Sequence, residues 1–268
     1  MRSRHAGSRL VSSSQEADAA VVGTQPQPLS IDEHIERLEI EGRRFGDVVA
    51  RTPLDAAVPG CPEWRVEELI GHLGDVHRWA GMIVRDQLQE RPRRDFAGPR
   101  DGDALLAWYA DGHAQLLDAL RGASPDDTFW AWAPAANALA FWARRQAHET
   151  AIHRLDAEQA AGSPTPFPAT AAADGVDECL LIASRRARIP DGRGRRLHFA
   201  ADDAAGDWLV ELRDDGISVQ RGVSGGECSV RAPASELFAL VMNRRDAAGL
   251  HLDGDVDLLR AWRDSAKL

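Results

Sequence analysis

Lysine is almost absent from this chain, because Lys267 is the only lysine among 32 basic residues. Asp and Glu together number 42, so the formal net charge is −10. A general nucleic-acid-binding protein presents a basic face, and this charge balance argues against one. The use of arginine for nearly all positive charge, with abundant Ala, Asp and Gly, indicates a GC-rich genome rather than a particular chemistry.

Cysteine is scarce as well, and Cys61, Cys179 and Cys228 are scattered with no Cys-x-x-Cys pair. This spacing indicates neither a disulfide framework nor a thiolate zinc site, and it favours a reduced, cytoplasmic setting. No apolar run approaches the roughly 20 residues of a membrane span. No apolar core follows the early arginines, which argues against a secretory signal. We therefore expect neither a membrane nor a nucleic acid as a partner.

The apolar pattern divides the chain into three regions. Residues 1–28 are rich in Ser, Ala, Gln and Gly without periodicity, which predicts a disordered extension. Residues 29–163 carry four amphipathic segments and predict a four-helix bundle. A Pro-rich break at 162–168 precedes a small α+β domain at 170–268. The expected bundle helices cover 31–51, 65–90, 103–121 and 137–161.

In the last region the period of the apolar residues changes from that of a helix to that of strands. The expected strands cover 197–200, 208–213, 217–221, 228–232 and 250–252. The expected helices of this region cover 170–187, 235–243 and 256–262. The sequence thus predicts an α+β fold in which a helical bundle comes first.

The helix expected over 137–161 contains the strongest candidate site. Glu149 and His153 are four residues apart, so a carboxylate and an imidazole share one helix face as two ligands for a divalent metal. His148 and His153 are five apart, about 140° around a helix, which excludes the two-histidine zinc-protease pattern. The alternative is a solvated Glu–His contact on a charged face. Metal binding requires a third ligand from elsewhere.

Further candidates lie near these two residues and on the helix expected over 65–90. Asp156 follows on the same face as Glu149 and His153. His72 and His77 border or enter the apolar stripe of their helix, where a histidine either points into the bundle interior or is a satisfied polar residue. Because His72 and His77 are five apart, we do not expect them to share a metal.

Two segments resemble the mycothiol-dependent maleylpyruvate isomerase family: WRVEELIGHLGDVHRWA at 64–80 and FWARRQAHETAIHRLDAE at 141–158. The resemblance implies a DinB-like four-helix bundle followed by a sterol-carrier-like α+β domain. It also implies that His72, Glu149 and His153 bind one divalent metal, usually zinc. Nickel or iron also suits such ligands. Three protein ligands leave a fourth position open, and the resemblance implies that mycothiol fills it.

The resemblance further implies an enzyme in which a metal-bound thiolate adds to an electrophilic small molecule. In the isomerase, addition to the double bond of maleylpyruvate, rotation and elimination leave fumarylpyruvate. Some relatives transfer the thiol permanently, so a mycothiol S-transferase in detoxification or natural-product biosynthesis is an alternative. A metal-binding sensor without catalysis is another, and a fourth protein ligand such as Asp156 or His77 would favour it. We expect a monomer or a homodimer.

The family also has an arginine after the long helix of its second domain, and the resemblance assigns it to the substrate's carboxylates. Asn243-Arg244-Arg245 falls at this place, and Arg244 is our candidate because arginine binds carboxylates at two points. The alternative is a solvated arginine at a helix C-terminus. Arg65 departs from the family pattern, since a Thr or Ser cap is common there.

Overall fold

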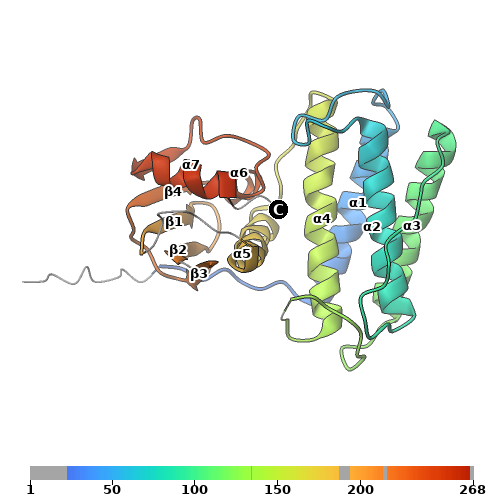
Figure 1. Cartoon of the computed structure of the whole chain (residues 1–268), viewed down its shortest axis with the longest axis horizontal. Helices are drawn as coiled ribbons and strands as arrows, with labels where there is room; N and C mark the ends of the chain where they lie inside the picture. Colours follow the sequence, from blue (N-terminus) through green and yellow to red (C-terminus); the bar gives the residue numbers. More distant parts are fainter. Residues whose placement is uncertain (1–22, 134, 187–193, 214–215, 266–268) are drawn as a thin grey trace, which may run out of the picture.

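The computed structural model of the chain consists of a helical bundle beside a smaller part that contains a sheet (Figure 1). The residues it describes are 23–133, 135–186, 194–213 and 216–265. The bundle is formed by α1 (Ile31–Val49), α2 (Val66–Arg85), α3 (Gly102–Gly122) and α4 (Ala138–Ala160). Within the described ranges, no helix combines the length and apolar character that a bilayer crossing requires. The predicted α+β fold class, with the bundle first, is confirmed.

The second part begins with α5 (Ala169–Arg186); the last residue of the helix predicted over 170–187 lies outside the described residues. It continues through β1 (Arg196–Ala201), β2 (Asp207–Arg213), β3 (Gly216–Arg221), β4 (Cys228–Ala232), α6 (Ala234–Val241), β5 (His251–Gly254) and α7 (Val256–Ser265). The strand order is β3-β2-β1-β4-β5, with β1 and β4 parallel and the other pairs antiparallel. Phe199, Trp208 and Trp262 are fully buried in the core that the sheet shares with the helices.

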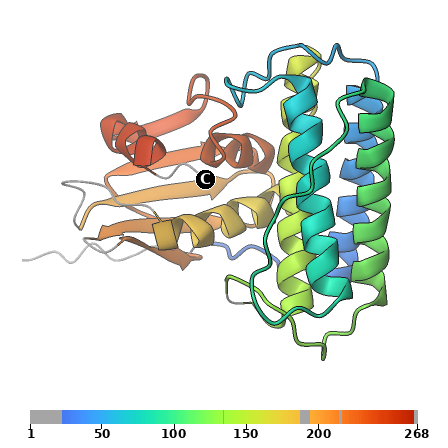
Figure 2. The same cartoon turned by 45° about the vertical axis from the view of Figure 1, so that its right-hand side comes forward.

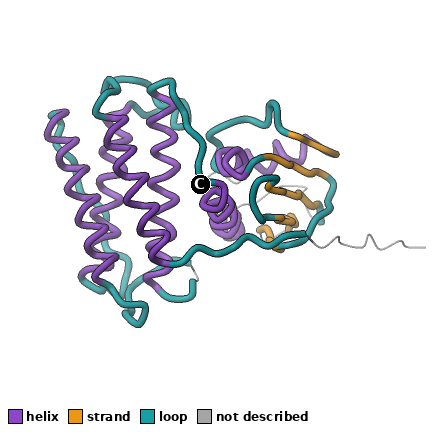
Figure 3. Tube along the Cα trace, turned by 180° about the vertical axis from the view of Figure 1, so that it is seen from behind, coloured by secondary structure: helices purple, strands orange, loops and turns teal. Residues whose placement is uncertain are grey.

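The segment before α1 connects the two parts. Residues 23–28 run beside the sheet and then to the end of the bundle where α1 begins (Figure 3). The Thr24 N–H donates to the Asp207 carboxylate at 2.8 Å, at the start of β2. The sequence predicts a disordered extension over 1–28, whereas the backbone of Gly23 and Thr24 is hydrogen-bonded to Gly222 and Asp207. Residues 1–22 lie outside the described part.

Two helices end earlier than the sequence predicts. α2 stops short of the predicted 65–90 because Gln87 has a φ of 48°, in the left-handed region that does not continue a helix. α6 stops short of the predicted 235–243 because Asn243 has a φ of 58°, which asparagine tolerates better than most residues. The turn at Asn243 brings Arg244 into contact with α4. The other predicted helices and strands overlap the observed ones.

Helix α4 is buried on almost every side, because it lies between the other bundle helices and α5 (Figure 2). Trp142 packs in the core of the bundle, whereas Ile152 and Leu155 pack in the core of the second part. The buried polar residues of α4 are Arg145, Gln146, His148, Thr150, His153, Arg154, Asp156 and Glu158. Burial of an unpaired charge is costly, so the charged residues of α4 need partners on both sides.

Arg154 has such partners on the bundle side, where it is fully buried. Its Nε donates to Glu41 of α1 at 2.7 Å, and its Nη1 donates to Glu158 at 2.8 Å. Nη1 also donates to the carbonyl of Thr165, in the Pro-rich segment after α4, at 2.8 Å. Arg154 thus fixes both the contact between α1 and α4 and the path of the chain out of the bundle.

Arg154→Ala should lower the free energy of unfolding by roughly 3–5 kcal/mol, because Glu41 would be left buried without a cation and Glu158 would keep only Arg44. Arg43→Ala is the control. Its ion pair with Glu39 is exposed and 3.9 Å long, so the loss should stay below about 1 kcal/mol. Urea unfolding of both variants measures the difference, and equal losses would contradict this role of Arg154.

Candidate functional site

The three candidate metal ligands converge from two helices. His72 of α2 lies with its Nε2 3.2 Å from Oε1 of Glu149 on α4. His153, one turn further along α4, lies with its Nε2 3.4 Å from the same oxygen. The two imidazole rings are 4.9 Å apart in an edge-to-face arrangement. The fold therefore brings together the residues that the sequence proposed from spacing and resemblance.

These separations fit one metal ion. Ligand atoms about 2.0–2.2 Å from a tetrahedral ion lie roughly 3.3 Å from one another. The two measured separations from Glu149 Oε1, 3.2 and 3.4 Å, fall around this value. Two imidazoles and one carboxylate are also a donor set that divalent zinc accepts. The residues present thus fit the metal that the sequence analysis expects.

The charges of the cluster depend on one another. Burial favours the neutral acid, but hydrogen bonds from His153 and His72 and the charge of Arg145 hold the pKa of Glu149 well below its usual value. Burial opposes protonation of His153, but Asp156 and Glu149 raise its pKa to about 9. Without a metal, the cluster therefore holds a proton on His153 between two carboxylates. A metal ion would displace this proton.

Asp156 holds the far side of His153. Its Oδ2 lies 2.8 Å from Nδ1 of His153, so Nε2 of the same ring is turned toward Glu149. Arg244, from the segment after α6, donates its Nε to Oδ1 of Asp156 at 2.8 Å and its Nη2 to Oδ2 at 3.0 Å. Asp156 is therefore a partner of a candidate ligand and of Arg244.

Arg145 contacts Glu149, as Asp156 contacts His153. Its Nη2 donates to Oε2 of Glu149 at 2.7 Å, which leaves Oε1 facing the two histidines. Its Nη1 donates to Glu178 of α5 at 2.5 Å. Both Arg145 and Glu178 are buried, so this is an ion-pair chain away from water.

The loop before α2 places Trp64 against the two histidines. The Arg65 N–H donates to the Glu68 carboxylate at 2.7 Å, which ties the residue before α2 to the first turn of the helix. The Trp64 ring lies 4.7 Å from the ring of His72 and 6.0 Å from that of His153. Trp64 therefore gives the candidate site one aromatic wall.

The cluster opens into a cavity of about 630 Å³ between the bundle and the second part. This volume is typical of a site for a small molecule. Arg244 lines the cavity with the triad, and Ile152, Ile182 and Met242 supply apolar surface. Cys61 also lines it, and burial together with the Asp156 carboxylate raises the pKa of its thiol to about 11. Its sulfur therefore stays protonated at neutral pH.

The two residues named as possible fourth ligands face elsewhere. Both oxygens of Asp156 are engaged by Arg244, and one of them also by His153. His77 is fully buried inside the bundle, with its Nε2 2.9 Å from the hydroxyl of Thr150. Among the described residues, the cluster that can hold a metal here consists of His72, Glu149 and His153 alone.

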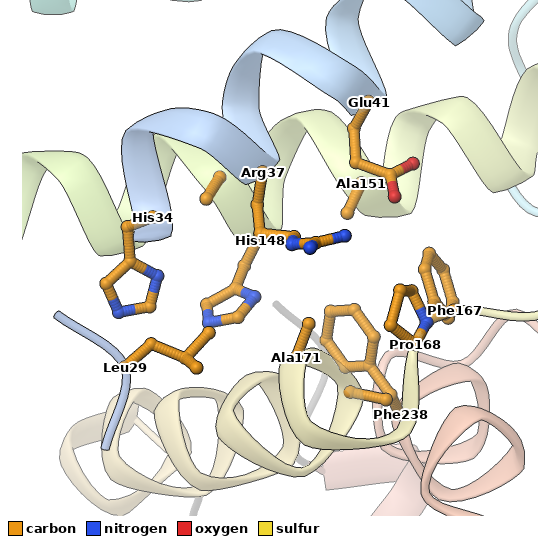
Figure 4. Close-up of a pocket in the computed structure, with 12 residues that line it drawn as sticks. Leu29, His34, Arg37, Glu41, His148, Ala151, Phe167, Pro168, Ala171 and Phe238 are labelled. Carbon is orange, nitrogen blue, oxygen red and sulfur yellow. The ribbon is translucent and has the colours of Figure 1, made fainter. Parts of the chain in front are cut away.

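A second cluster at the interface combines His34 of α1, His148 of α4 and Asp174 of α5. Figure 4 shows the two histidines at one end of a small pocket and Phe167 at the other; its volume, about 10 Å³, is that of one water. Nε2 of His148 lies 2.7 Å from Oδ2 of Asp174, and Nε of Arg144 lies 3.0 Å from the same oxygen. A guanidinium therefore occupies the carboxylate oxygen that His148 contacts, and the cluster links α1, α4 and α5 where the two parts meet.

Some residues of the candidate site were predicted from the sequence, and others were not. The spacing of Glu149 and His153 predicted their shared face, and His148 indeed points away from them toward Asp174. Sequence reasoning missed the roles of Arg145 and Glu178. Arg145 precedes Glu149 by four residues, which is a readable signal for an ion pair. The contact with Glu178 has no such signal.

The family described as Mycothiol maleylpyruvate isomerase N-terminal domain matches residues 35–158. Over 85% of its length the chain is similar to two solved structures of a mycothiol-dependent maleylpyruvate isomerase, one of them a histidine-to-alanine mutant. Each shares 14% sequence identity with this chain, and each alignment covers 85% of this chain and 95% of the solved one. The TM-score is 0.60 for the mutant and 0.58 for the other structure. At this identity the likeness shows the fold. No curated protein matches the chain.

The raised pKa of His153 gives a prediction for the metal-free protein. Because the folded pKa of about 9 exceeds the usual 6.5, the contacts of the charged ring add stability below pH 6.5, and this stability is lost as the pH rises through about 9. An NMR titration of the imidazole should show a pKa near 9, which Asp156→Asn lowers and Asp177→Asn leaves unchanged. A pKa at or below 6.5 in the unaltered chain would contradict this arrangement.

Proposed function

We propose that the protein is a metal-dependent enzyme that uses mycothiol, because residues 35–158 match the family described as Mycothiol maleylpyruvate isomerase N-terminal domain. The observation that carries the proposal is a triad of candidate ligands, without a fourth among the residues that the structure describes, on the wall of a cavity of about 630 Å³. A divalent metal, in our proposal zinc, supplies when bound a Lewis acid that lowers the pKa of a thiol and makes thiolate available at neutral pH.

The residues of the chain prepare this site. His72 and His153 direct Nε2 toward one point, and Glu149 is held ionised with Oε1 toward the same point. Trp64 keeps water from one side of the two rings. Cys61 remains a protonated thiol and a weak nucleophile, which favours a sulfur nucleophile from outside the chain. These features favour a low-molecular-weight thiol as the second substrate or cofactor.

We assign Arg244 to a carboxylate of the electrophilic substrate. Its guanidinium lines the cavity with the triad, and Asp156 and the Met242 carbonyl fix its position. The Asp156 carboxylate raises the pKa of Arg244 against the opposing effect of burial, so the group stays cationic. A cation on the cavity wall beside the triad suits a substrate that carries a carboxylate. The reaction is cis–trans isomerisation by reversible thiol addition, with permanent thiol transfer as the alternative.

A metal sensor without catalysis is the other class of function. A sensor site of this kind would be closed by a fourth protein ligand, but Asp156 is engaged by Arg244 and by Nδ1 of His153, and His77 by Thr150. The open cavity and the cation at its wall therefore favour the enzyme. The free thiols of the three cysteines agree with our assignment to the cytoplasm. A bundle at 29–163 and a second domain at 170–268 remain our proposed domains.

The first test uses cobalt in place of zinc, since it reports ligands by colour. The protein should bind about one Co²⁺ per chain, and added mycothiol should produce a sulfur-to-metal charge-transfer band. His72→Ala and His153→Ala should each lose most of the bound metal and the band. Full metal occupancy in both variants, or no spectral change at saturating mycothiol, would contradict the proposed site.

The second test separates Arg244 from its neighbour at saturating metal. Arg244→Ala should lower kcat/KM for a carboxylate-bearing electrophile about tenfold to a hundredfold, because a charge-assisted contact contributes roughly 1.5–3 kcal/mol. Arg245→Ala is the matched control, since its guanidinium bonds the carbonyls of Asp246 and Ala248. We expect nearly unchanged activity there. Loss of activity in Arg245→Ala alone would mean that the wrong arginine was chosen.

A further inference from the structure

Each candidate ligand on α4 has a charged partner on the same helix, and each partner is held by the second part of the chain. The first path runs from His153 to Asp156 and from Asp156 to Arg244, with contacts of 2.8, 2.8 and 3.0 Å. The side chain of Asp156 is fully buried and that of Arg244 is 13% exposed. This path joins the metal site to the turn that follows α6.

The second path runs from Glu149 to Arg145 and from Arg145 to Glu178, with contacts of 2.7 and 2.5 Å. The Arg145 and Glu178 side chains are 10% and 8% exposed. This path joins the metal site to α5. The two paths are independent, since they start on different ligands and end on different elements of the second part.

We propose that the second part of the chain sets the metal affinity of the bundle through these two paths, with Asp156, Arg145 and Glu178 as positioning residues and Arg244 in a second, positioning role. This inference rests on the proposed function, because it takes His72, Glu149 and His153 as the ligands. It adds that a metal site whose ligands all lie in the bundle depends on residues outside the bundle.

The two paths affect the metal affinity for different physical reasons. Asp156 accepts the Nδ1–H of His153 and so fixes the tautomer in which Nε2 is the ligand atom. Loss of such a partner typically weakens metal binding by 10- to 100-fold. Arg244 holds both oxygens of Asp156 in place for this bond. An Asp156 released from Arg244 would be free to rotate away from the ring.

On the second path, Arg145 is a buried cation beside a site for a dication. Its charge is shared between Glu149 and Glu178, both within hydrogen-bond distance. Without the Glu178 carboxylate, the whole charge of Arg145 would act on Glu149 and on the incoming metal. Glu149 would then be a poorer ligand, and the metal would meet a net repulsion at low local dielectric.

A control variant is available at the same interface, because Asp177, next to Glu178 on α5, also bonds an arginine of α4. Asp177 accepts from Nη2 of Arg144 at 2.9 Å, whereas Glu178 accepts from Arg145. Among the described residues, Arg144 is hydrogen-bonded to Asp174 and Asp177 and makes no hydrogen bond or ion pair with the triad. Asp177→Asn and Glu178→Gln therefore each remove one buried interdomain carboxylate, and only the second lies on a path to a ligand.

The experiment is a competition titration of Zn²⁺ between the full-length protein and a chromogenic chelator at fixed pH. Glu178→Gln and Arg244→Ala should each bind Zn²⁺ about 10- to 100-fold more weakly than the unaltered chain, and Asp156→Asn at least as weakly. Asp177→Asn should stay within about twofold. Thermal unfolding of the metal-free variants, followed by circular dichroism, verifies that all of them are folded at the titration temperature.

The outcomes separate this inference from the proposed function. If the unaltered chain binds Zn²⁺ and both Glu178→Gln and Arg244→Ala bind it equally well, the inference is wrong and the proposed function stands. If Asp177→Asn loses as much affinity as Glu178→Gln, the interface acts by general packing and the two paths do not exist. If the unaltered chain binds no Zn²⁺, the proposed function fails and the inference fails with it.

Discussion

The pairing of buried charges along α4 is the constraint on which the rest of this structure depends. The helix lies between the other bundle helices and α5, so almost no side of it is left to water. A buried charge without a partner costs several kcal/mol, so each charged side chain must meet a partner from another element or from the next turn. Arg154 finds Glu41 in the bundle, and Arg145 finds Glu178 in the second part. The two parts of the chain are thereby held in one arrangement.

This constraint also explains why a candidate site occurs at the junction. The same helix that carries Glu149 and His153 forms one wall of the cavity, and the turn after α6 brings Arg244 to another. A pocket between two packed parts can hold groups from both, which is why small-molecule sites are common at such interfaces. The bundle supplies the candidate ligands, and the second part supplies the cation and the partners of the ligands.

Two clusters of the same composition differ in what contacts the carboxylate oxygen that lies nearest the histidines. Both contain two histidines and one carboxylate. At Glu149 the histidine nitrogens stand 3.2 and 3.4 Å from one oxygen, as ligands of one ion do. At Asp174, His148 is 2.7 Å away and Arg144 occupies the same oxygen. In addition, burial lowers the pKa of His34 to about 4, so this histidine is neutral at pH 7.

Local spacing predicted much of the fold and part of the site. The four bundle helices and the later strands follow from apolar periodicity, and the shared face of Glu149 and His153 follows from a separation of four residues. The end of α2 was missed because the left-handed conformation of Gln87 has no signature in a sequence of helix-forming residues.

Contacts between distant segments were beyond this kind of reasoning. Spacing placed Asp156 on the face of the ligands, but its choice of His153 and Arg244 depends on side-chain rotamers and on the packing of the second part. The partner of Arg145 depends on how α5 docks on α4, which no local pattern encodes. His72 entered through the resemblance, and its helix pattern alone left it as either a ligand or a buried polar residue.

The central claim is that one metal ion binds between His72, Glu149 and His153, and anomalous X-ray diffraction at the zinc edge tests it most directly. In crystals of the zinc-loaded protein, the account predicts one strong anomalous peak about 2.0–2.2 Å from Nε2 of each histidine and from Oε1 of Glu149. The fourth position should be filled by solvent or an added thiol. A peak at the cluster of His34, His148 and Asp174 in its place, or no peak at either cluster, would contradict the account.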